Sequence, residues 1–176
     1  MISYLTDMDG VLHREGSVIP GAEEFIGTLR DEGIEFMVLT NNSMQTPRDL
    51  SARLMRMGLE IEPERIWTSA TATARLLSQQ AGTASAYVIG EAGLTTALHE
   101  VGWILTDADP DFVVLGETRT YSFEALTTAC NLILRGSRFI ATNPDMTGPG
   151  PNGVIPATGS VAAMITAVTG MQPYYV

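Results

Sequence analysis

The first part of the chain alternates short apolar runs with amphipathic stretches. An apolar run at residues 2–6 is typical of a strand that is buried on both faces. The following stretch, "AEEFIGTLRDEG", places apolar residues at the i, i+3, i+4 and i+7 positions of a helix and ends at Gly33. This pattern predicts a strand and then a helix that packs one face against a core.

The same order of strand and helix occurs twice more. A second strand over "EFMVLT" ends at Thr40, and a helix follows with Thr46 as its N-cap and Pro47 in its first turn. A third strand at residues 66–68 precedes a helix that has Ser69 as its cap and runs to about Gln80. Three such pairs in succession are typical of a parallel sheet with right-handed crossovers.

The spacing of apolar runs starts afresh near residue 86. Two further stretches each show a strand that closes on Gly-Glu, then a helix, then another strand. A Gly- and Pro-rich loop, an apolar helix at residues 161–168 and the strand start "PYYV" follow. We therefore predict an α/β protein with the N-terminal part of a parallel-sheet core at residues 1–85, a smaller α/β unit at 86–170, and a return toward the first sheet at 171–176.

Composition and charge narrow the class of partner. The formal net charge of -10 argues against nucleic acid and against an anionic membrane, since both require a basic surface. No apolar run approaches the ~20 residues of a membrane span. The single cysteine, Cys130, cannot form an internal disulfide, and its helical spacing predicts a buried core position. We expect a cytoplasmic protein; the sequence leaves its oligomeric state open, with a homodimer as one option.

Two aspartates stand where the first strand is predicted to end. Asp7 and Asp9 are one residue apart, and carboxylates this close repel each other unless a cation or a proton lies between them. Mg²⁺ prefers oxygen ligands, often one or two carboxylates with water and substrate phosphate. Gly10 lets the backbone turn, so that the two side chains can approach one phosphorus from different directions. The pattern predicts a magnesium site at Asp7 and Asp9.

This pair of carboxylates suits the two steps of phosphoester hydrolysis. One aspartate attacks phosphorus and forms an aspartyl phosphate, while the second protonates the leaving alcohol and later deprotonates the attacking water. Because ligands bind beyond the carboxyl ends of parallel strands, Thr40 is expected at the same edge. Its hydroxyl, and the amides of Asn41 and Asn42, would hydrogen-bond phosphoryl oxygens without adding charge.

At these residues the chain resembles a known family. "DMDGVL" and "IPGAEEFIGTLRDEGIEFMVLTNNS" resemble the haloacid dehalogenase (HAD) superfamily, and "WTSATATARLL", "VIGEAGL", "DPDFVVLGE" and "FIATNPD" are similar to its NagD-like branch. The resemblance implies a Rossmann-like core with an inserted cap at residues 86–170 that selects a small phosphorylated metabolite. It also implies Asp7 as nucleophile, Asp9 as acid/base with its backbone carbonyl on Mg²⁺, and Thr40 and Asn41 on the phosphate.

Two motifs of this branch are missing. The branch carries a lysine in a Gly-Lys-Pro context, directly after the segment that resembles "TGMQPYYV", and further metal-binding aspartates beyond it. All ten basic residues of this chain are arginine. The resemblance therefore implies that these 176 residues are the front two-thirds of a phosphatase and are inactive alone.

Other interpretations of the same residues remain open. Asp7 and Asp9 could form only a turn, or could hold a metal on the diphosphate of a nucleotide sugar in a DxD glycosyltransferase. The chain could also be a non-catalytic module that binds phosphate or assembles with a partner. His13, four residues after Asp9, is expected to face water and is left out of catalysis.

Three polar residues follow strands of the second unit. They are Glu117, Asn143 and Asp145. Their positions fit contacts to a substrate, and fit helix capping and turn formation equally well.

Overall fold

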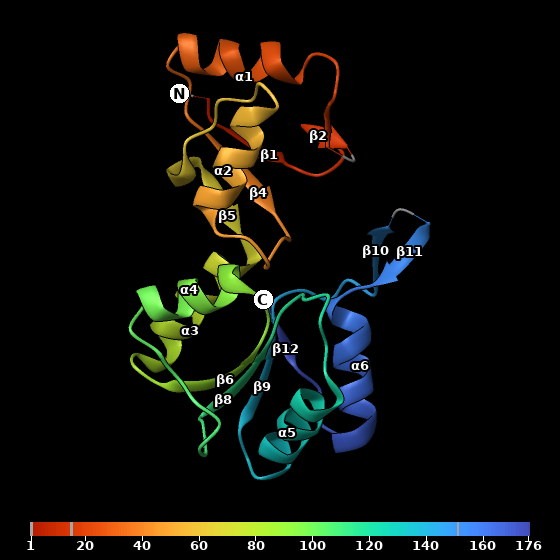
Figure 1. Ribbon diagram of the computed structural model, residues 1–176. Coiled ribbons are helices and arrows are strands. Elements are labelled where there is room, and N and C mark those ends of the chain that lie inside the picture. The colour runs from red at the N-terminus through yellow and green to blue at the C-terminus, as the bar shows by residue number, and fades with distance from the viewer. Residues whose placement is uncertain (1, 15, 151) are drawn as a thin grey trace. The chain divides into compact units, whose positions relative to one another are not determined.

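The computed structural model describes residues 2–14, 16–150 and 152–176, and the chain forms two compact units (Figure 1). The first unit consists of the chain up to Asn41 together with Gln45–Thr68. The second unit holds Asn42–Met44 and Ser69–Val176.

The first unit is built on a three-stranded parallel sheet. Its strands are β1 (Tyr4–Asp7), β4 (Phe36–Thr40) and β5 (Ile66–Thr68), in the order β1-β4-β5. Asp7 lies opposite Leu39 in the register, so β1 and β4 end at the same edge of the sheet. This arrangement confirms the predicted parallel order.

Two helices cover this sheet, α1 (Ala22–Asp31) and α2 (Pro47–Arg56). A capping box starts α2: the Thr46 side chain accepts from the Asp49 amide at 3.2 Å, and the Asp49 carboxylate accepts from the Thr46 amide at 3.3 Å. Apolar side chains of the strands and helices form one buried cluster that includes Met8, Leu12, Ile26, Leu29, Phe36, Val38, Leu50 and Leu54.

Short elements complete the first unit. The strands β2 (His13–Arg14) and β3 (Ser17–Val18) pair as an antiparallel hairpin, and a 3₁₀ turn, η1 (Pro63–Arg65), precedes β5.

The exposure of β1 differs from the prediction of a strand buried on both faces. In the part of the chain that the structure describes, β1 pairs with β4 alone, and Leu5 is 72% exposed. An apolar run is buried on both faces only where each face has a covering layer, and the apolar sequence by itself does not supply that layer.

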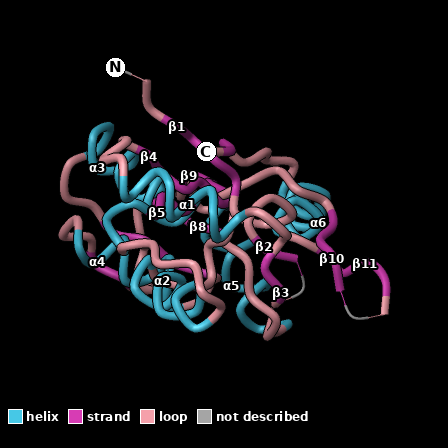
Figure 2. The backbone as a smooth tube through the Cα atoms, turned by 90° about the horizontal axis from the view of Figure 1, so that it is seen from above, coloured by secondary structure: helices cyan, strands magenta, loops and turns pink. Residues whose placement is uncertain are grey.

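The second unit contains a five-stranded parallel sheet of order β12-β9-β8-β6-β7. Its strands are β6 (Ser85–Ile89), β7 (Ile104–Leu105), β8 (Phe112–Leu115), β9 (Arg138–Ala141) and β12 (Tyr174–Tyr175). A separate hairpin of β10 (Thr147–Gly150) and β11 (Gly153–Pro156) projects beyond the N-terminal end of the last helix of the unit, α6 (Thr158–Thr169) (Figure 1, Figure 2).

Helices cover both faces of this sheet. The helices α3 (Ser69–Ala81) and α4 (Ala92–Glu100) pack together, and α5 (Phe123–Leu134) packs with α6. Along β8, Phe112 and Val114 lie in the cluster with α3 and α4, whereas Val113 and Leu115 lie in the cluster with α5 and α6. Successive side chains of a strand point to opposite faces, so β8 is buried throughout.

The division into units differs from the predicted ranges 1–85, 86–170 and 171–176. The boundary falls between Thr68 and Ser69, because Leu77 of α3 is buried in one cluster with Leu98 of α4. Residues 171–176 include β12, which pairs with β9 of the second sheet and not with the first sheet. A repeating β-α order does not specify which sheet a helix or a terminal strand joins.

Two smaller predictions concern single segments. Cys130 is buried on α5, as its helical spacing predicted. Within the described ranges, no helix combines the length and the apolar character needed to cross a bilayer.

Candidate active site

The loop that follows β1 turns sharply, so that His13 forms a backbone bridge with Asp9. Gly10 has a φ of 83°, in the left-handed region that favours glycine, and its N–H donates to the His13 carbonyl at 2.8 Å. Asp7 ends β1, and its Oδ1 accepts from the Met8 amide at 2.8 Å. The sharp turn expected at Gly10 is therefore present, and Asp7 Oδ1 is held by the backbone.

The structure brings Asp9 and Thr40 together. Thr40 ends β4 and is buried, and its Oγ1 donates to Asp9 Oδ2 at 3.3 Å. This contact exists because β1 and β4 are parallel neighbours, so that the loops after them meet at one sheet edge. Asn41 follows in the first unit, whereas Asn42 belongs to the second unit and its Oδ1 accepts from the Met44 amide at 2.9 Å.

His13 is buried, which corrects the expectation that it faces water. It is only 5% exposed, and its Nε2 lies 3.4 Å from Asp9 Oδ1. The turn at Gly10 and the β2–β3 hairpin cause this burial, since they fold the chain back until His13 forms a backbone bridge with Asp9. The sequence carried one signal, the four-residue spacing of His13 from Asp9 across a glycine turn.

A cation from another element reaches the same imidazole. Arg53 of α2 places Nη2 at 3.3 Å from His13 Nε2, and its Nη1 donates to Gln45 Oε1 at 3.0 Å. Burial lowers the pKa of His13; the Asp9 carboxylate raises this pKa, and the Arg53 guanidinium lowers it again. The net effect is a pKa of His13 below its usual value.

The chain offers carboxylates to a metal ion at this edge. Asp7 is exposed, and the Asp9 side chain is 53% exposed, so both are accessible to a hydrated cation. Among the residues that the structure describes, no group of three or more His, Cys, Asp or Glu side chains is placed to hold a metal. A pair of oxygen donors with room for water fits Mg²⁺, which commonly keeps several waters beside one or two carboxylates.

The candidate residues of the second unit lie at the carboxyl ends of its strands. Asn143, after β9, is buried, and its Nδ2 donates to Asp145 Oδ2 at 2.6 Å, while its Oδ1 accepts from the Thr142 hydroxyl at 3.0 Å. Glu117, after β8, donates its backbone N–H to Ser43 Oγ at 2.8 Å. The contacts of Asn143 fit the turn-forming interpretation.

Glu91 is a residue at this sheet edge that the sequence analysis did not select as a candidate. It follows β6, and its carboxylate accepts from the buried Thr118 hydroxyl. The Gly-Glu pair that closes both β6 and β8 was the available signal.

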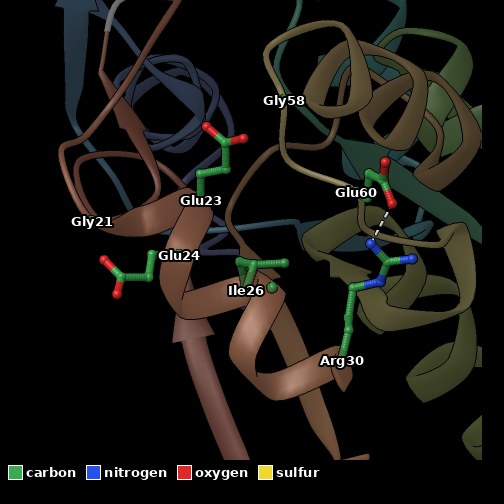
Figure 3. A pocket seen from close by; sticks show the side chains of 8 residues that line it. Gly21, Glu23, Glu24, Ile26, Arg30, Gly58 and Glu60 are labelled. Carbon is green, nitrogen blue, oxygen red and sulfur yellow. Dashed lines mark hydrogen bonds and ion pairs between the residues drawn. The ribbon is translucent and has the colours of Figure 1, made fainter. Parts of the chain in front are cut away.

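The first unit has a surface depression beside α1. An ion pair between Arg30 and Glu60 crosses it (Figure 3). Its lining consists of Gly21, Glu23, Glu24, Ile26, Gly27, Arg30, Gly58 and Glu60. None of the candidate catalytic residues lines this depression.

Comparison with known proteins identifies the family. The model of the haloacid dehalogenase-like hydrolases matches residues 4–104. A dihydroxyacetone phosphatase of Corynebacterium glutamicum (strain R) is 71% identical over 175 residues, which cover 99% of this chain and 64% of that relative. The ribonucleotide monophosphatase NagD of Escherichia coli (strain K12) is 41% identical over 174 residues, which cover 99% of this chain and 68% of NagD.

Solved structures agree with this result. A hypothetical protein from Pyrococcus horikoshii OT3 superposes with a TM-score of 0.96 at 34% identity, covering 100% of this chain and 71% of that one. NagD from the E. coli K-12 strain superposes with a TM-score of 0.90 at 40% identity, covering 99% and 68%. This chain thus spans about two thirds of the length of such relatives. It belongs to the haloacid dehalogenase-like hydrolase family, in its NagD-like branch.

Proposed function

We propose that the protein hydrolyses phosphoesters of small metabolites, with Asp7 as nucleophile and Asp9 as general acid and base. The observation that carries this proposal is the meeting of two strand ends, where the Asp7–Asp9 loop and Thr40 share one sheet edge. Membership of a hydrolase family, with relatives named as phosphatases, favours phosphoryl transfer to water over glycosyl transfer.

In the first step Asp7 attacks phosphorus. Its Oδ1 accepts from the Met8 amide at 2.8 Å, so we assign the attack on phosphorus to the other oxygen, Oδ2. As the new bond between oxygen and phosphorus forms, the bond to the leaving alcohol breaks, and Asp9 gives that alcohol its proton. Thr40 Oγ1–H, which donates to Asp9 in this structure, turns to a phosphoryl oxygen.

In the second step the aspartyl phosphate is hydrolysed. Asp9, now a carboxylate, takes a proton from water, and that water oxygen attacks phosphorus. The bond between phosphorus and Asp7 Oδ2 breaks, which releases inorganic phosphate and restores both aspartates. The half-exposed Asp9 side chain lets water reach it for this step.

Asp7, through its carboxylate, and Asp9, through its backbone carbonyl, are also the residues that would hold Mg²⁺. When bound, the ion neutralises phosphoryl oxygens so that a carboxylate can approach phosphorus. We further propose the second unit as the cap that selects the substrate, with Glu117, Asn143 and Asp145 as candidate contacts.

The proposed substrate class follows from the relatives. The corynebacterial relative at 71% identity is named a dihydroxyacetone phosphatase, so we propose a triose phosphate, dihydroxyacetone phosphate, as the first substrate. Ribonucleoside monophosphates are the second candidates, through the 41% identity to NagD.

The test measures phosphate release by the complete natural polypeptide that contains these residues. We expect dihydroxyacetone phosphate to be hydrolysed with Mg²⁺ and not after chelation, and Asp7→Asn to abolish turnover. Asp107→Asn, in an exposed loop of the second unit, is the matched control and should retain activity. Undiminished turnover by Asp7→Asn would refute the role of Asp7. Transfer from a labelled nucleotide sugar, without phosphate-ester hydrolysis, would instead favour a glycosyltransferase.

A further inference from the structure

The sheet of the second unit has a topological switch point between β6 and β8. From β6 the chain passes through α4 to β7 on one side of β6, and it then continues to β8 on the other side. The helices that follow β6 and β8 cover opposite faces, since Leu98 of α4 and Leu132 of α5 lie in different buried clusters. In open α/β sheets a crevice forms beyond the carboxyl ends of two such strands, and ligands commonly bind there.

In this protein a segment of the chain itself lies at the carboxyl ends of β6 and β8. This segment, Asn42–Met44, belongs to the second unit. Ser43 is fully buried, and its Oγ accepts from the backbone N–H of Glu117, after β8, at 2.8 Å. The Met44 carbonyl accepts from the N–H of Gly93, in the first turn of α4, at 2.9 Å. Backbone donors from both sides of the switch point therefore hold the segment.

A glycine follows each of the two strands, and one of them leaves the space that Ser43 fills. A Cβ atom on Gly116, after β8, would lie 3.0 Å from Ser43 Oγ and 2.8 Å from Leu94 Cδ2. A Cβ atom on Gly90, after β6, would lie 3.0 Å from the same Leu94 Cδ2, and none of its three nearest atoms belongs to Ser43. Gly116 is thus the position where an added methyl group would displace the Ser43 hydroxyl.

These contacts hold residues that the sequence predicts to bind phosphate. Asn42 Oδ1 accepts from the Met44 N–H at 2.9 Å, which fixes the plane of the Asn42 amide. Asn41 is the preceding residue, and because consecutive Cα atoms are about 3.8 Å apart, a fixed Asn42 restricts where Asn41 can lie. A hydrogen-bonding group that is held in place before a ligand arrives loses less conformational entropy on binding.

We infer that Ser43 is a positioning residue, whose hydrogen bond with the Glu117 amide holds Asn41 and Asn42 in place for the phosphoryl group of the substrate. The inference rests on the proposed function, and it assigns no substrate contact to Ser43. Free phosphate, the bound ester and the transition state all present phosphoryl oxygens to the same residues. Loss of positioning should therefore raise KM and the inhibition constant of inorganic phosphate more than it lowers kcat.

A matched pair of glycine variants separates positioning from a general loss of packing. Gly116→Ala presses on Leu94 and on Ser43 Oγ, whereas Gly90→Ala presses on the same Leu94 atom. In the complete natural polypeptide with Mg²⁺, we expect Gly116→Ala to raise KM for dihydroxyacetone phosphate and the inhibition constant of phosphate about fivefold, with kcat changed less than about twofold. Gly90→Ala should lower Tm as well, but should change all three constants less than about twofold.

Variants of Ser43 test the hydrogen bond itself. Ser43→Ala removes the acceptor of the Glu117 amide and should raise KM and the inhibition constant of phosphate about fivefold. When Ser43→Ala and Gly116→Ala are combined, the added methyl group no longer meets Oγ, so the rise should stay near about fivefold and not multiply to about 25-fold. Circular dichroism melts show which variants are folded at the assay temperature, and the glycine pair decides the test if Ser43→Ala is not folded.

The possible outcomes distinguish the inference from the function on which it rests. Equal rises for Gly116→Ala and Gly90→Ala, or a folded Ser43→Ala with unchanged KM and unchanged inhibition by phosphate, would overturn the positioning role while Asp7-dependent hydrolysis stands. If the unmodified polypeptide hydrolyses neither dihydroxyacetone phosphate nor ribonucleoside monophosphates with Mg²⁺, the proposed function fails and the inference fails with it.

Discussion

Replacing Gly159 with alanine should destabilise the second unit, although the same change usually stabilises a helix. Gly159 is the second residue of α6, and its N–H donates to the Asp145 carbonyl at 2.8 Å. A Cβ atom on Gly159 would lie 2.2 Å from the Pro144 carbonyl oxygen and 2.8 Å from that of Asp145. Both neighbours are backbone atoms, so no change of side-chain rotamer can relieve the overlap.

The expected magnitude comes from competing effects of opposite sign. Alanine in place of a helical glycine stabilises by about 0.5–1 kcal/mol. Overpacking a filled site destabilises by about 1–3 kcal/mol, and the hydrogen bond to Asp145 that must lengthen contributes about 1 kcal/mol more. The destabilisation from the steric overlap exceeds the gain in helix propensity, so we expect Gly159→Ala to lower the free energy of unfolding by about 1–3 kcal/mol.

The matched control makes the same substitution where space is available. Gly27 lies within α1, and a Cβ atom there would meet no heavy atom within 4 Å. Gly27→Ala should therefore stabilise its unit by about 0.5–1 kcal/mol. Urea unfolding followed by far-UV circular dichroism, with tryptophan fluorescence as a second probe, measures both changes.

The sign of the Gly159 change tests the close approach of α6 to the loop that holds Asn143 and Asp145. If Gly159→Ala stabilised the protein as much as Gly27→Ala does, the backbone contact at Pro144 would be absent in solution. The packing of α6 against that loop would then differ in solution from the packing described above.

Three further predictions concern pH, a helix cap and a buried hydroxyl. Folding lowers the pKa of His13 from 6.5, so below pH 6.5 the unfolded chain binds a proton before the folded chain does, and the folded protein loses stability as the pH falls. In metal-free buffer, the Tm of the unmodified protein should therefore fall more steeply between pH 7 and pH 5 than the Tm of His13→Gln. Equal slopes for the two proteins would contradict this prediction. Thr46→Ala removes the capping box of α2 and should cost about 1 kcal/mol in urea unfolding, whereas Thr46→Ser should cost less. Ser43→Ala leaves the Glu117 amide without its acceptor and should lower the free energy of unfolding by about 1–3 kcal/mol; a change below about 0.3 kcal/mol would show that water replaces the hydroxyl.

The sequence by itself determined the order of the elements and the chemistry at the strand ends. Apolar periodicity reports which face of a segment is buried, and this was enough to predict the helices of the first unit, the parallel sheets and the buried Cys130. The placement of Thr40 beside Asp9 followed from the same local information, because neighbouring parallel strands end at one edge.

Only the tertiary structure decided which partner each buried face meets. The apolar face of α3 could cover either sheet, and β12 could pair at either one; contacts between residues distant in the sequence place both in the second unit. The burial of His13 has the same origin, since the contact with Arg53 spans forty residues and leaves no periodic signal in the chain. Local pattern specifies that a surface is buried, whereas the partner is selected by packing across the whole unit.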